Sequence, residues 1–552
     1  MNFKNCIFSG FLVLVFALSI HAKDAFDELL DLVDTPEITN AIINSEIITT
    51  RQASKQSILL TLIDWEIPAL LQENIFLRSN KLNSRSLLDY PEFFPFGHDH
   101  DQRAIYLNLF YNQTSRLNFT KDSTNICSYL GIFEPSFITK LQKTISIIKD
   151  NIPIEPEQAT HILQLLQTFT VQERRLGLMI GGKTTFGCWN FHIMAPWYYL
   201  ERNHFVDKKI EDAIEALTTE LLERIVGASQ LTPAQQALAQ KRRDAFIDQH
   251  LIADKFGIGD TRIYIDRPFI KRKFLSSRIG VLATIPTAFA MKSGLKGAHL
   301  RLVKNRPLLD FVEVFEAGMS KQISPAALNY GVAFLDNLGA MLLDAPLGNG
   351  GHFGLGIFLR NKSPLTSLVK LDWARNFTMR SFASLEYLFP AVEWRSARVP
   401  VNEALFNQRN FSPSETDQLI INSNYRFLVE QLTDRLFPVA LQARVHPGIV
   451  FRWSSQFCYE YNNKGFTLGT DTYVRNREAL TNLNADPATK KIIDIFNAHA
   501  PLSYQSKVVG SFFFKIPKCD REFMIGLWGD YTFMNKGIGA DFSLVFKCDV
   551  TF

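Results

Sequence analysis

The last twelve residues, Asp541-Phe-Ser-Leu-Val-Phe-Lys-Cys-Asp-Val-Thr-Phe552, alternate in polarity along almost their whole length. One set of alternate positions is apolar and comprises Phe542, Leu544, Phe546, Cys548, Val550 and Phe552. The positions between them are polar except for Val545. A period of two is the pattern of a β-strand whose two faces meet different environments. The stretch therefore predicts a terminal strand, either in a barrel wall or in an amphipathic sheet of a soluble protein.

A strand of this kind that ends the chain on an aromatic residue resembles the closing strand of Gram-negative outer-membrane β-barrels. In that family the terminal Phe is part of the signal that the barrel-assembly machinery recognises. The resemblance implies that Phe546, Val550 and Phe552 act as an assembly signal. It also implies two partners, the assembly machinery and the lipid of the outer membrane.

The N-terminus has the pattern of a secretory signal peptide. Lys4 precedes an apolar core over residues 7–20, and Ala22 offers a cleavage position. The alternative is that this segment stays as an N-terminal anchor. No later run of eighteen apolar residues predicts a transmembrane helix, and a secreted chain without such a helix can span a membrane only as a closed barrel. We therefore expect a signal peptide at 1–22, a periplasmic extension or plug at 23–102, and a barrel at 103–552.

The composition excludes some classes of partner. The net charge of +4 is small and the Lys and Arg residues are scattered, which argues against a nucleic-acid-binding protein. An aromatic content of 12 %, with 46 Phe, suits a wall that faces lipid. Five cysteines remain after the signal peptide, an odd number, so at least one is unpaired (Cys127, Cys188, Cys458, Cys519 and Cys548).

No cofactor is expected from the motifs. No CxxC or Cys/His spacing predicts a zinc site. His98 and His100, in a run of alternating His and Asp, are weak metal-ligand candidates, because the His and Asp side chains converge only if the run is a loop. The alternative is a solvated approach to the first strand.

Alternating segments recur through the chain and predict about twelve antiparallel strands, at 103–112, 173–181, 187–197, 260–266, 274–289, 365–373, 379–389, 437–461, 465–474, 507–516, 522–533 and 541–552. The joints between them are alternately short and long, apart from a short last one. This is the pattern of an outer-membrane barrel with periplasmic turns and extracellular loops. With an even number of strands, both termini are expected in the periplasm.

Three details of this assignment are open or unusual. Residues 352–360 could also form a strand and, with a partner, raise the number to fourteen. We interpret 437–461 as one long strand because the alternation keeps its phase through Pro447. The long loops carry helical spacing, which predicts helical insertions at 136–148, 158–166, 210–225, 308–317, 328–343, 418–435 and 488–497.

Charged and polar residues of both signs fall on the predicted inner face. The candidate lumen-lining and solute-contact residues are Arg262, Asp266, Arg278, Lys370, Arg380, Glu386, Arg444, Arg452, Glu460, Asp471 and Asp530, with Arg175, His192, Tyr264, Asp372, Lys515, Glu522 and Trp528 on the same face. Such charges require water or mutual pairing, because an isolated charge in a low dielectric is costly. They therefore predict either a hydrophilic pore or a ladder of salt bridges that fills a narrow lumen.

Aromatic residues gather where the two rims are expected: Trp197, Tyr198 and Tyr199 at one end, and Phe457, Tyr459, Tyr461 and Phe552 at the other. Residues 256–262, which contain a Gly-Asp pair, resemble a strand start in channels of the fatty-acid-transporter and aromatic-solute type. Gly-Asp is also an ordinary turn signal.

The leading functional hypothesis is an outer-membrane β-barrel that passes small or hydrophobic solutes passively. One alternative is a surface-binding or adhesion barrel with a plugged lumen. Another is a lipid-modifying enzyme with a Ser/His pair at a rim, for which His192 and Ser454 are the candidates, although no Gly-x-Ser-x-Gly element is present.

Overall fold

The alternating terminal stretch is a strand, β17 (Ala540–Thr551), with a hydrogen-bonded neighbour on each edge. It pairs antiparallel with β1 (Ala104–Arg116) on one side and with β16 (Arg521–Lys536) on the other. Its two faces differ as expected: Leu544 is 48 % exposed, whereas Val545 is fully buried. The first and last strands of the chain therefore lie side by side in one wall.

The structure is a computed structural model that describes residues 84–93, 103–117, 170–205, 252–272, 274–293, 347–367, 372–397, 439–485, 487–492, 498–518 and 521–552. The other strands of the main sheet are β2 (Thr170–Phe186), β3 (Trp189–Phe205), β4 (Ile252–Ile258), β5 (Thr261–Arg272), β6 (Leu275–Ile285), β7 (Phe289–Ser293), β8 (Gly354–Pro364), β9 (Phe377–Leu388), β12 (Gly448–Tyr461), β13 (Lys464–Arg475) and β15 (Ser503–Lys518). All of these residues belong to one compact unit, Ile67–Phe552.

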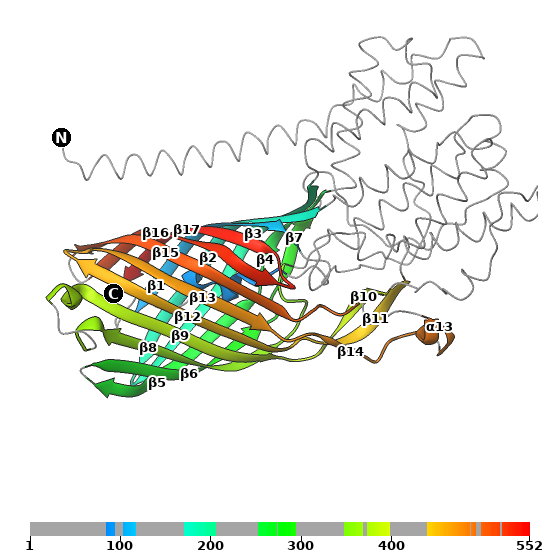
Figure 1. Cartoon of the computed structure of the whole chain (residues 1–552), viewed down its shortest axis with the longest axis horizontal. Helices are drawn as coiled ribbons and strands as arrows, with labels where there is room; N and C mark the ends of the chain where they lie inside the picture. The colour runs from blue at the N-terminus through cyan, green and yellow to red at the C-terminus, as the bar shows by residue number, and fades with distance from the viewer. Residues whose placement is uncertain are drawn as a thin grey trace, which may run out of the picture. The chain divides into compact units, whose positions relative to one another are not determined.

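This sheet closes on itself. Its order runs from β2 through β1 and β17 round to β3, and β2 also pairs with β3 along their whole length. The two pairs β4/β5 and β6/β7 are each one strand interrupted near its middle, so the fourteen segments form a barrel of twelve antiparallel strands (Figure 1). The predicted all-β barrel of twelve strands is confirmed within the described part of the chain.

The two ends of the barrel differ. At one end, called here the short-turn end, β2 continues into β3 through two residues, β12 continues into β13, and the amide of Phe552 donates to the carbonyl of Arg103 at 2.9 Å. The opposite end, called the long-loop end, carries the longer connections, apart from residues 537–539 between β16 and β17; at the short-turn end, the longest connection is 365–376 between β8 and β9. The start of β1 and the C-terminus thus share one end, as an even number of strands requires.

The wall is interrupted beside Asp260. Gly259 and Asp260 separate β4 from β5, and residues 286–288 separate β6 from β7. The segment at 347–352 packs into this break, where the amide of Asn349 donates to Asp260 Oδ2 at 2.6 Å. A Cβ on Gly348 would lie 2.4 Å from Asp260 Oδ1, so only glycine allows this close approach.

Three strands continue past the long-loop end as a small sheet of β10 (Ala391–Ala397), β11 (Val439–His446) and β14 (Ala479–Thr481). This corrects the interpretation of 437–461 as one strand, because Pro447 separates β11 from β12 and Gly448 has a φ of +77°. Pro447 has no amide hydrogen to give to the ladder, so the pairing stops there. Arg444, predicted in the lumen, is exposed on this outer sheet.

The predicted strand at 365–373 is wrong, and the open possibility at 352–360 is the true strand. β8 ends at Pro364, and the 3-10 turns η5 (Leu365–Ser367) and η6 (Asp372–Asn376) follow it. Asp372 therefore lies in a turn, and Lys370 lies outside the described residues. β8 replaces the mistaken strand, which is why the number stays at twelve.

Apolar side chains cover the outside of the barrel and polar ones fill the inside. Leu355, Ile357, Leu468 and Leu527 are about half exposed, whereas Arg262 and Asp471 are fully buried. Of the predicted rim aromatics, Trp197, Phe457, Tyr461 and Phe552 are exposed, but Tyr198 points inward and is buried. In the described residues, no helix is long and apolar enough to cross a membrane.

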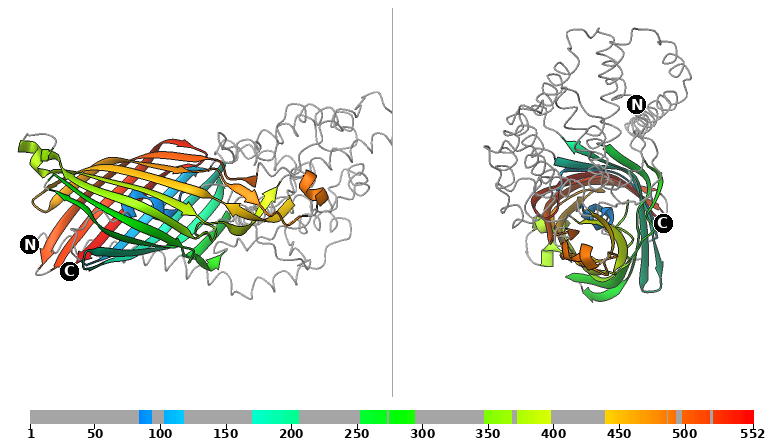
Figure 2. Two further views of the ribbon diagram at one scale, coloured as in Figure 1. Left: turned by 90° about the horizontal axis from the view of Figure 1, so that it is seen from below. Right: turned by 90° about the vertical axis from the view of Figure 1, so that its right-hand side faces the viewer.

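Most of the predicted helical insertions lie outside the described residues, as do the signal peptide, His98 and His100. Within the described part of the last long loop, a short helix, α13 (Pro487–Ile492), overlaps the prediction at 488–497. The 3-10 turns η1 (Leu87–Asp89) and η2 (Pro91–Phe93) precede the first strand. The end-on view in Figure 2 shows this segment inside the ring of strands.

Candidate functional site

The strands bring most of the predicted inner-face residues together inside the barrel. Arg262, Asp266, Arg278, Glu386, Arg452, Asp471 and Asp530 are all buried there, as are Arg175, His192, Tyr264 and Trp528. Arg380 and Glu460 are half-buried toward the short-turn end, where Lys515 Nζ lies 2.5 Å from Glu460 Oε1 and 4.0 Å from Glu522 Oε1. The alternation of inner and outer positions along each strand is enough to predict that these side chains face the inside of the barrel.

The centre of the site is a segment that the strand pattern did not assign. Residues 84–93, called here the lumen segment, lie within the barrel and pack against its inner side chains. Leu87, Leu88, Tyr90 and Phe93 are buried in the same apolar cluster as strand residues such as Phe110 and Tyr264. This part of the range 23–102, for which an extension or a plug is predicted, lies inside the barrel (Figure 2).

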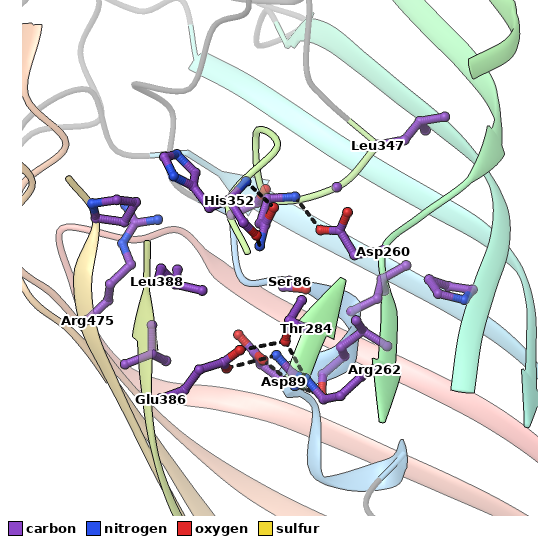
Figure 3. A pocket seen from close by; sticks show the side chains of 18 of the residues that line it. Ser86, Asp89, Asp260, Arg262, Thr284, Leu347, His352, Glu386, Leu388 and Arg475 are labelled. Carbon is purple, nitrogen blue, oxygen red and sulfur yellow. Dashed lines mark hydrogen bonds and ion pairs between the residues drawn. The ribbon is translucent and has the colours of Figure 1, made fainter. Parts of the chain in front are cut away.

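Asp89 of the lumen segment completes a ring of alternating charges with three strands (Figure 3). Its Oδ1 lies 2.7 Å from Arg262 Nη1 and 2.5 Å from Arg452 Nη2, and Glu386 pairs with the same two guanidiniums. Burial alone would raise the pKa of Asp89, but Arg452 and Arg262 outweigh it and lower that pKa. The ring is electrically balanced only while Asp89 is in place.

Arg85 anchors the N-terminal part of the lumen segment to the barrel wall. Its Nη2 lies 2.6 Å from Asp471 Oδ2, and its guanidinium stacks 5.0 Å from the ring centres of Tyr90 and Tyr473. Its carbonyl oxygen accepts a hydrogen bond of 2.6 Å from Arg175 Nη1. Because Arg85, Asp471 and Tyr473 are all buried, a break in this pair would leave a charge without its partner in a low dielectric.

Tyr90 links the segment to the closing strands. Its hydroxyl donates to Asp541 Oδ2 and accepts from Asn112 Nδ2 at 3.1 Å. Lys507 Nζ lies 4.1 Å from the centre of its ring and pairs with Asp541 and, at 2.8 Å, with Asp530. The segment is therefore held by strands from opposite sides of the barrel.

Besides Arg85 Nε, the buried polar group of the segment without a hydrogen-bond partner among the described residues is the carboxyl group of Glu92. It is buried, and neither of its carboxylate oxygens has a hydrogen-bond partner among the described residues. Burial, together with the negative charge of Asp530, raises its pKa well above the ordinary value. Its surroundings therefore favour the protonated form of Glu92 over the ionised one.

A cavity lies on each side of the segment. The larger, of about 100 Å³, opens toward the long-loop end and is lined by Ser86, Asp89, Arg262, Glu386 and Arg395 among others. The smaller, of about 50 Å³, is lined by Glu92, Asn108, Lys547, Phe513 and Trp528 among others. Both have a mainly polar or mixed lining, and the lumen segment contributes to both, with Ser84 to Asp89 in the larger and Pro91 to Phe93 in the smaller.

A second charge cluster lies nearer the short-turn end. Asp266 pairs with Arg278 and Arg360, and its Oδ2 lies 3.5 Å from His192 Nε2. His192 hydrogen-bonds to Tyr106, whereas Ser454 accepts a hydrogen bond from Gln456 at 3.4 Å. The two residues considered for a rim hydrolase therefore belong to separate hydrogen-bond groups, and both are buried in the lumen.

No group of three or more His, Cys, Asp or Glu side chains is arranged to hold a metal ion in the part of the chain that the structure describes. Cys188, Cys458 and Cys548 are free cysteines there.

No protein-family model and no curated protein sequence matches the chain. Solved structures do resemble it. The COG4313 outer-membrane channel from Pseudomonas putida F1 is 5 % identical, with 83 % of this chain and 98 % of that chain covered and a TM-score of 0.36. The Pseudomonas putida toluene transporter TodX is 8 % identical (87 % and 94 % covered, TM-score 0.28), and the monoaromatic hydrocarbon channel CymD is 7 % identical (82 % and 88 %, TM-score 0.26).

Likenesses this distant carry no argument about mechanism or solute, so the assignment depends on the molecule itself. It has a closed antiparallel wall, an apolar outer face that ends in aromatic residues, and a polar, charge-paired interior. The protein is a closed, twelve-stranded antiparallel β-barrel with the apolar outer face of a barrel that spans a membrane.

Proposed function

We propose that the protein is a channel for small solutes in which the lumen segment closes the passage. The observation that carries this proposal is the pair of interior cavities that successive parts of the lumen segment line, Ser84 to Asp89 in the larger and Pro91 to Phe93 in the smaller. A barrel built merely to display loops needs no polar spaces in its interior. In this view Arg262, Asp266, Arg278, Arg380, Glu386, Arg452, Glu460, Asp471 and Asp530 line the path, and solute passes when the segment leaves its seat.

The lining favours solutes with polar groups over bare hydrocarbons. Arg262, Arg452 and Glu386 border the larger cavity, and a solute that displaces Asp89 has to replace its bonds to the two guanidiniums. The smaller cavity adds Phe513 and Trp528, which tolerate an apolar portion. A small solute with one polar end and one apolar end fits both.

The proposed orientation places both termini in the periplasm and the long loops outside the cell. It rests on the alternation of short turns and long connections, which is the usual asymmetry of outer-membrane barrels. In the same proposal Phe546, Val550 and Phe552 of β17 are recognised by the barrel-assembly machinery.

One observation favours a second function, a plugged barrel that binds partners at the cell surface. The lumen segment is fastened by buried ion pairs at both Arg85 and Asp89, as a permanent plug would be. The two proposals differ in whether the segment ever leaves, so one experiment separates them.

The experiment is conductance of the purified full-length protein in planar lipid bilayers, compared with the variant Arg85→Ala/Asp89→Ala. Removing both anchors frees the segment, and we expect brief or rare openings of the wild type to become long-lived openings in the variant. The matched control is Arg116→Ala/Arg174→Ala, which removes two exposed charges at the long-loop end and should behave as the wild type.

Heat modifiability on a semi-native gel shows that each variant is folded. Silence of both the wild type and the folded double variant over many insertions would reject the channel and leave the plugged surface barrel.

A further inference from the structure

Charge is distributed unevenly between the inside and the outside of the barrel. Every acidic side chain whose exposure the structure describes is buried or half-buried, whereas the exposed charged side chains of the described residues are all Arg or Lys. Among the described residues, the fully exposed charges are therefore all positive. Exposed positive charge without acidic neighbours favours the binding of an anionic partner.

At the short-turn end this charge is combined with aromatic rings on the outward face. Arg267 lies over the ring of Trp189 at 5.4 Å, Lys464 over Phe514 at 5.8 Å, and Arg521 over Phe552 at 5.1 Å. All six side chains are exposed. None of the three cations has an acidic ion-pair partner among the described residues.

The pairs occupy the ends of strands around the barrel. They lie on β3 and β5, on β13 and β15, and on β16 with the residue that follows β17. A fourth pair, Arg272 over Phe274 at 6.0 Å, stands where β5 turns into β6. Together these residues form what is called here the basic rim: Arg267, Arg272, Lys464 and Arg521 with Trp189, Phe274, Phe514 and Phe552.

We propose that the basic rim binds the phosphate groups of anionic phospholipids in the leaflet that meets the short-turn end. Aromatic rings favour the depth of the headgroups, and a Lys or Arg beside them is placed at the level of the lipid phosphates. Attraction to an anionic leaflet is worth about fivefold in binding for each basic side chain near the surface, from roughly 1 kcal/mol each.

The arrangement favours lipid over a protein partner or a free phosphate ion. The pairs lie on the same outward sides as the apolar band of exposed residues such as Phe191, Phe466 and Leu527, so they continue the surface that meets the membrane. They are also spread around the barrel, which suits a shell of lipid, whereas a single protein would cover one side. A free phosphate ion would gain nothing from the rings.

The test counts the lipids that stay bound. The full-length protein is reconstituted in vesicles of equal parts phosphatidylcholine and phosphatidylglycerol, extracted gently, and analysed by native mass spectrometry. We expect phosphatidylglycerol to be enriched severalfold over phosphatidylcholine on the wild type. The enrichment should fall severalfold in the variant Arg267→Gln/Lys464→Gln/Arg521→Gln, which keeps Arg272 alone of the four rim cations.

The matched control is Arg116→Gln/Arg174→Gln/Arg444→Gln, which removes three exposed charges at the long-loop end and should keep the enrichment. The substituted side chains are exposed, so folding is expected to persist and is checked by heat modifiability.

Three outcomes would overturn the proposal. The first is equal binding of the two lipids by the wild type. The second is enrichment that survives in the rim variant or disappears equally in the control. The third is displacement of the lipid by inorganic phosphate at constant ionic strength, which would indicate an ion site. The result is independent of conductance, so it stands or falls separately from the channel proposal.

Discussion

Single residues in this barrel have different pH dependences because of where they lie. The pKa of Asp89 is lowered, so its carboxylate stabilises the seated lumen segment at pH values above the ordinary pKa of about 3.9. That contribution is lost as the pH falls below this value toward the lowered pKa. The pKa of Glu92 is raised, so its carboxyl group stabilises the seated segment fully at pH values below the ordinary pKa of about 4.3. That contribution is lost as the pH rises through the raised pKa.

Glu92 is therefore expected to make the channel open more as the pH rises through the raised pKa of this group. Once ionised, its carboxylate is buried near Asp530 without a hydrogen-bond partner among the described residues, so the segment is driven from its seat. The ratio of open to closed channels should rise by at most about tenfold per pH unit, since one proton is involved.

Single-channel recording between acidic and alkaline pH measures this ratio. Glu92→Gln, which resembles the protonated form, should remove the rise, and the control Glu460→Gln at the short-turn end should retain it. An unchanged pH profile in Glu92→Gln would exclude Glu92 as the titrating group.

Neighbouring residues of the adjacent strands β15 and β16 also differ sharply in the substitutions they tolerate, according to whether they face outward or inward. Leu527 is 48 % exposed on the outer face near the middle of β16, whereas Ser511 on β15 points inward, with its Oγ 2.6 Å from Thr467 Oγ1. Leu527→Arg should lower the free energy of unfolding by about 2–4 kcal/mol because the charge meets hydrocarbon, and Ser511→Arg should lower it much less.

Denaturant titration in lipid vesicles measures both values, and Phe512→Arg, on the outer face beside Leu527, should follow Leu527→Arg. Equal losses for Leu527→Arg and Ser511→Arg would mean that the outer and inner faces are wrongly assigned.

At the scale of elements, β17 is the strand on which closure depends, because it pairs with both β1 and β16. Deletion of Phe552 removes the amide that donates to the Arg103 carbonyl and the ring beside Arg521. It also removes the residue proposed to be recognised by the assembly machinery. We expect unassembled protein in the periplasm, detected by fractionation and protease accessibility at the cell surface.

The conservative variant Phe552→Tyr keeps an aromatic terminus and should assemble. Normal surface assembly of the deletion variant would contradict the assembly-signal proposal.

Strands with strict alternation were predictable from sequence, and elements held by distant side chains were not. Phe542 to Phe552 alternate and form β17, and the inner positions of Arg262, Glu386 and Arg452 follow from the same rule. Residues 84–93 have no period, and their place depends on ion pairs to residues hundreds of positions away, such as Arg85 with Asp471. The sequence feature that could have indicated this buried, ion-paired position is limited to the charged residues Arg85 and Asp89 in a stretch otherwise rich in apolar residues.

Two element errors have local causes. Apolar residues in 365–373 imitate a strand, but Pro364 ends β8 just before them and two 3-10 turns follow. The alternation through Pro447 is real, yet the missing amide separates two sheets. In both places a proline ends the strand, although the pattern of polar and apolar residues predicts that the strand continues.

At the scale of the whole molecule, closure of the sheet adds its stability to that of the apolar cluster and the ion pairs inside the barrel. The inner face holds ion pairs such as Lys507 with Asp530, and pairing of β2 with β3 closes the ladder, so that within the main sheet only the short β7 has a neighbour, β4, on one edge alone. Separating any two strands would expose backbone groups to hydrocarbon, so the barrel should resist detergent until it is heated.

Heat modifiability on a semi-native gel tests this closure directly. The unboiled membrane fraction should give a band that migrates faster than the boiled one, because the closed barrel stays compact in detergent. A variant that weakens one seam, Gly177→Val, should lose the shift at a lower temperature, since a Cβ on Gly177 would lie 2.2 Å from the carbonyl oxygen of Trp197. Gly182→Val is the matched control, because the nearest atom to its Cβ is 3.6 Å away. A single unshifted band in the soluble fraction would reject the membrane barrel, and with it the separation of inner and outer faces on which both proposals depend.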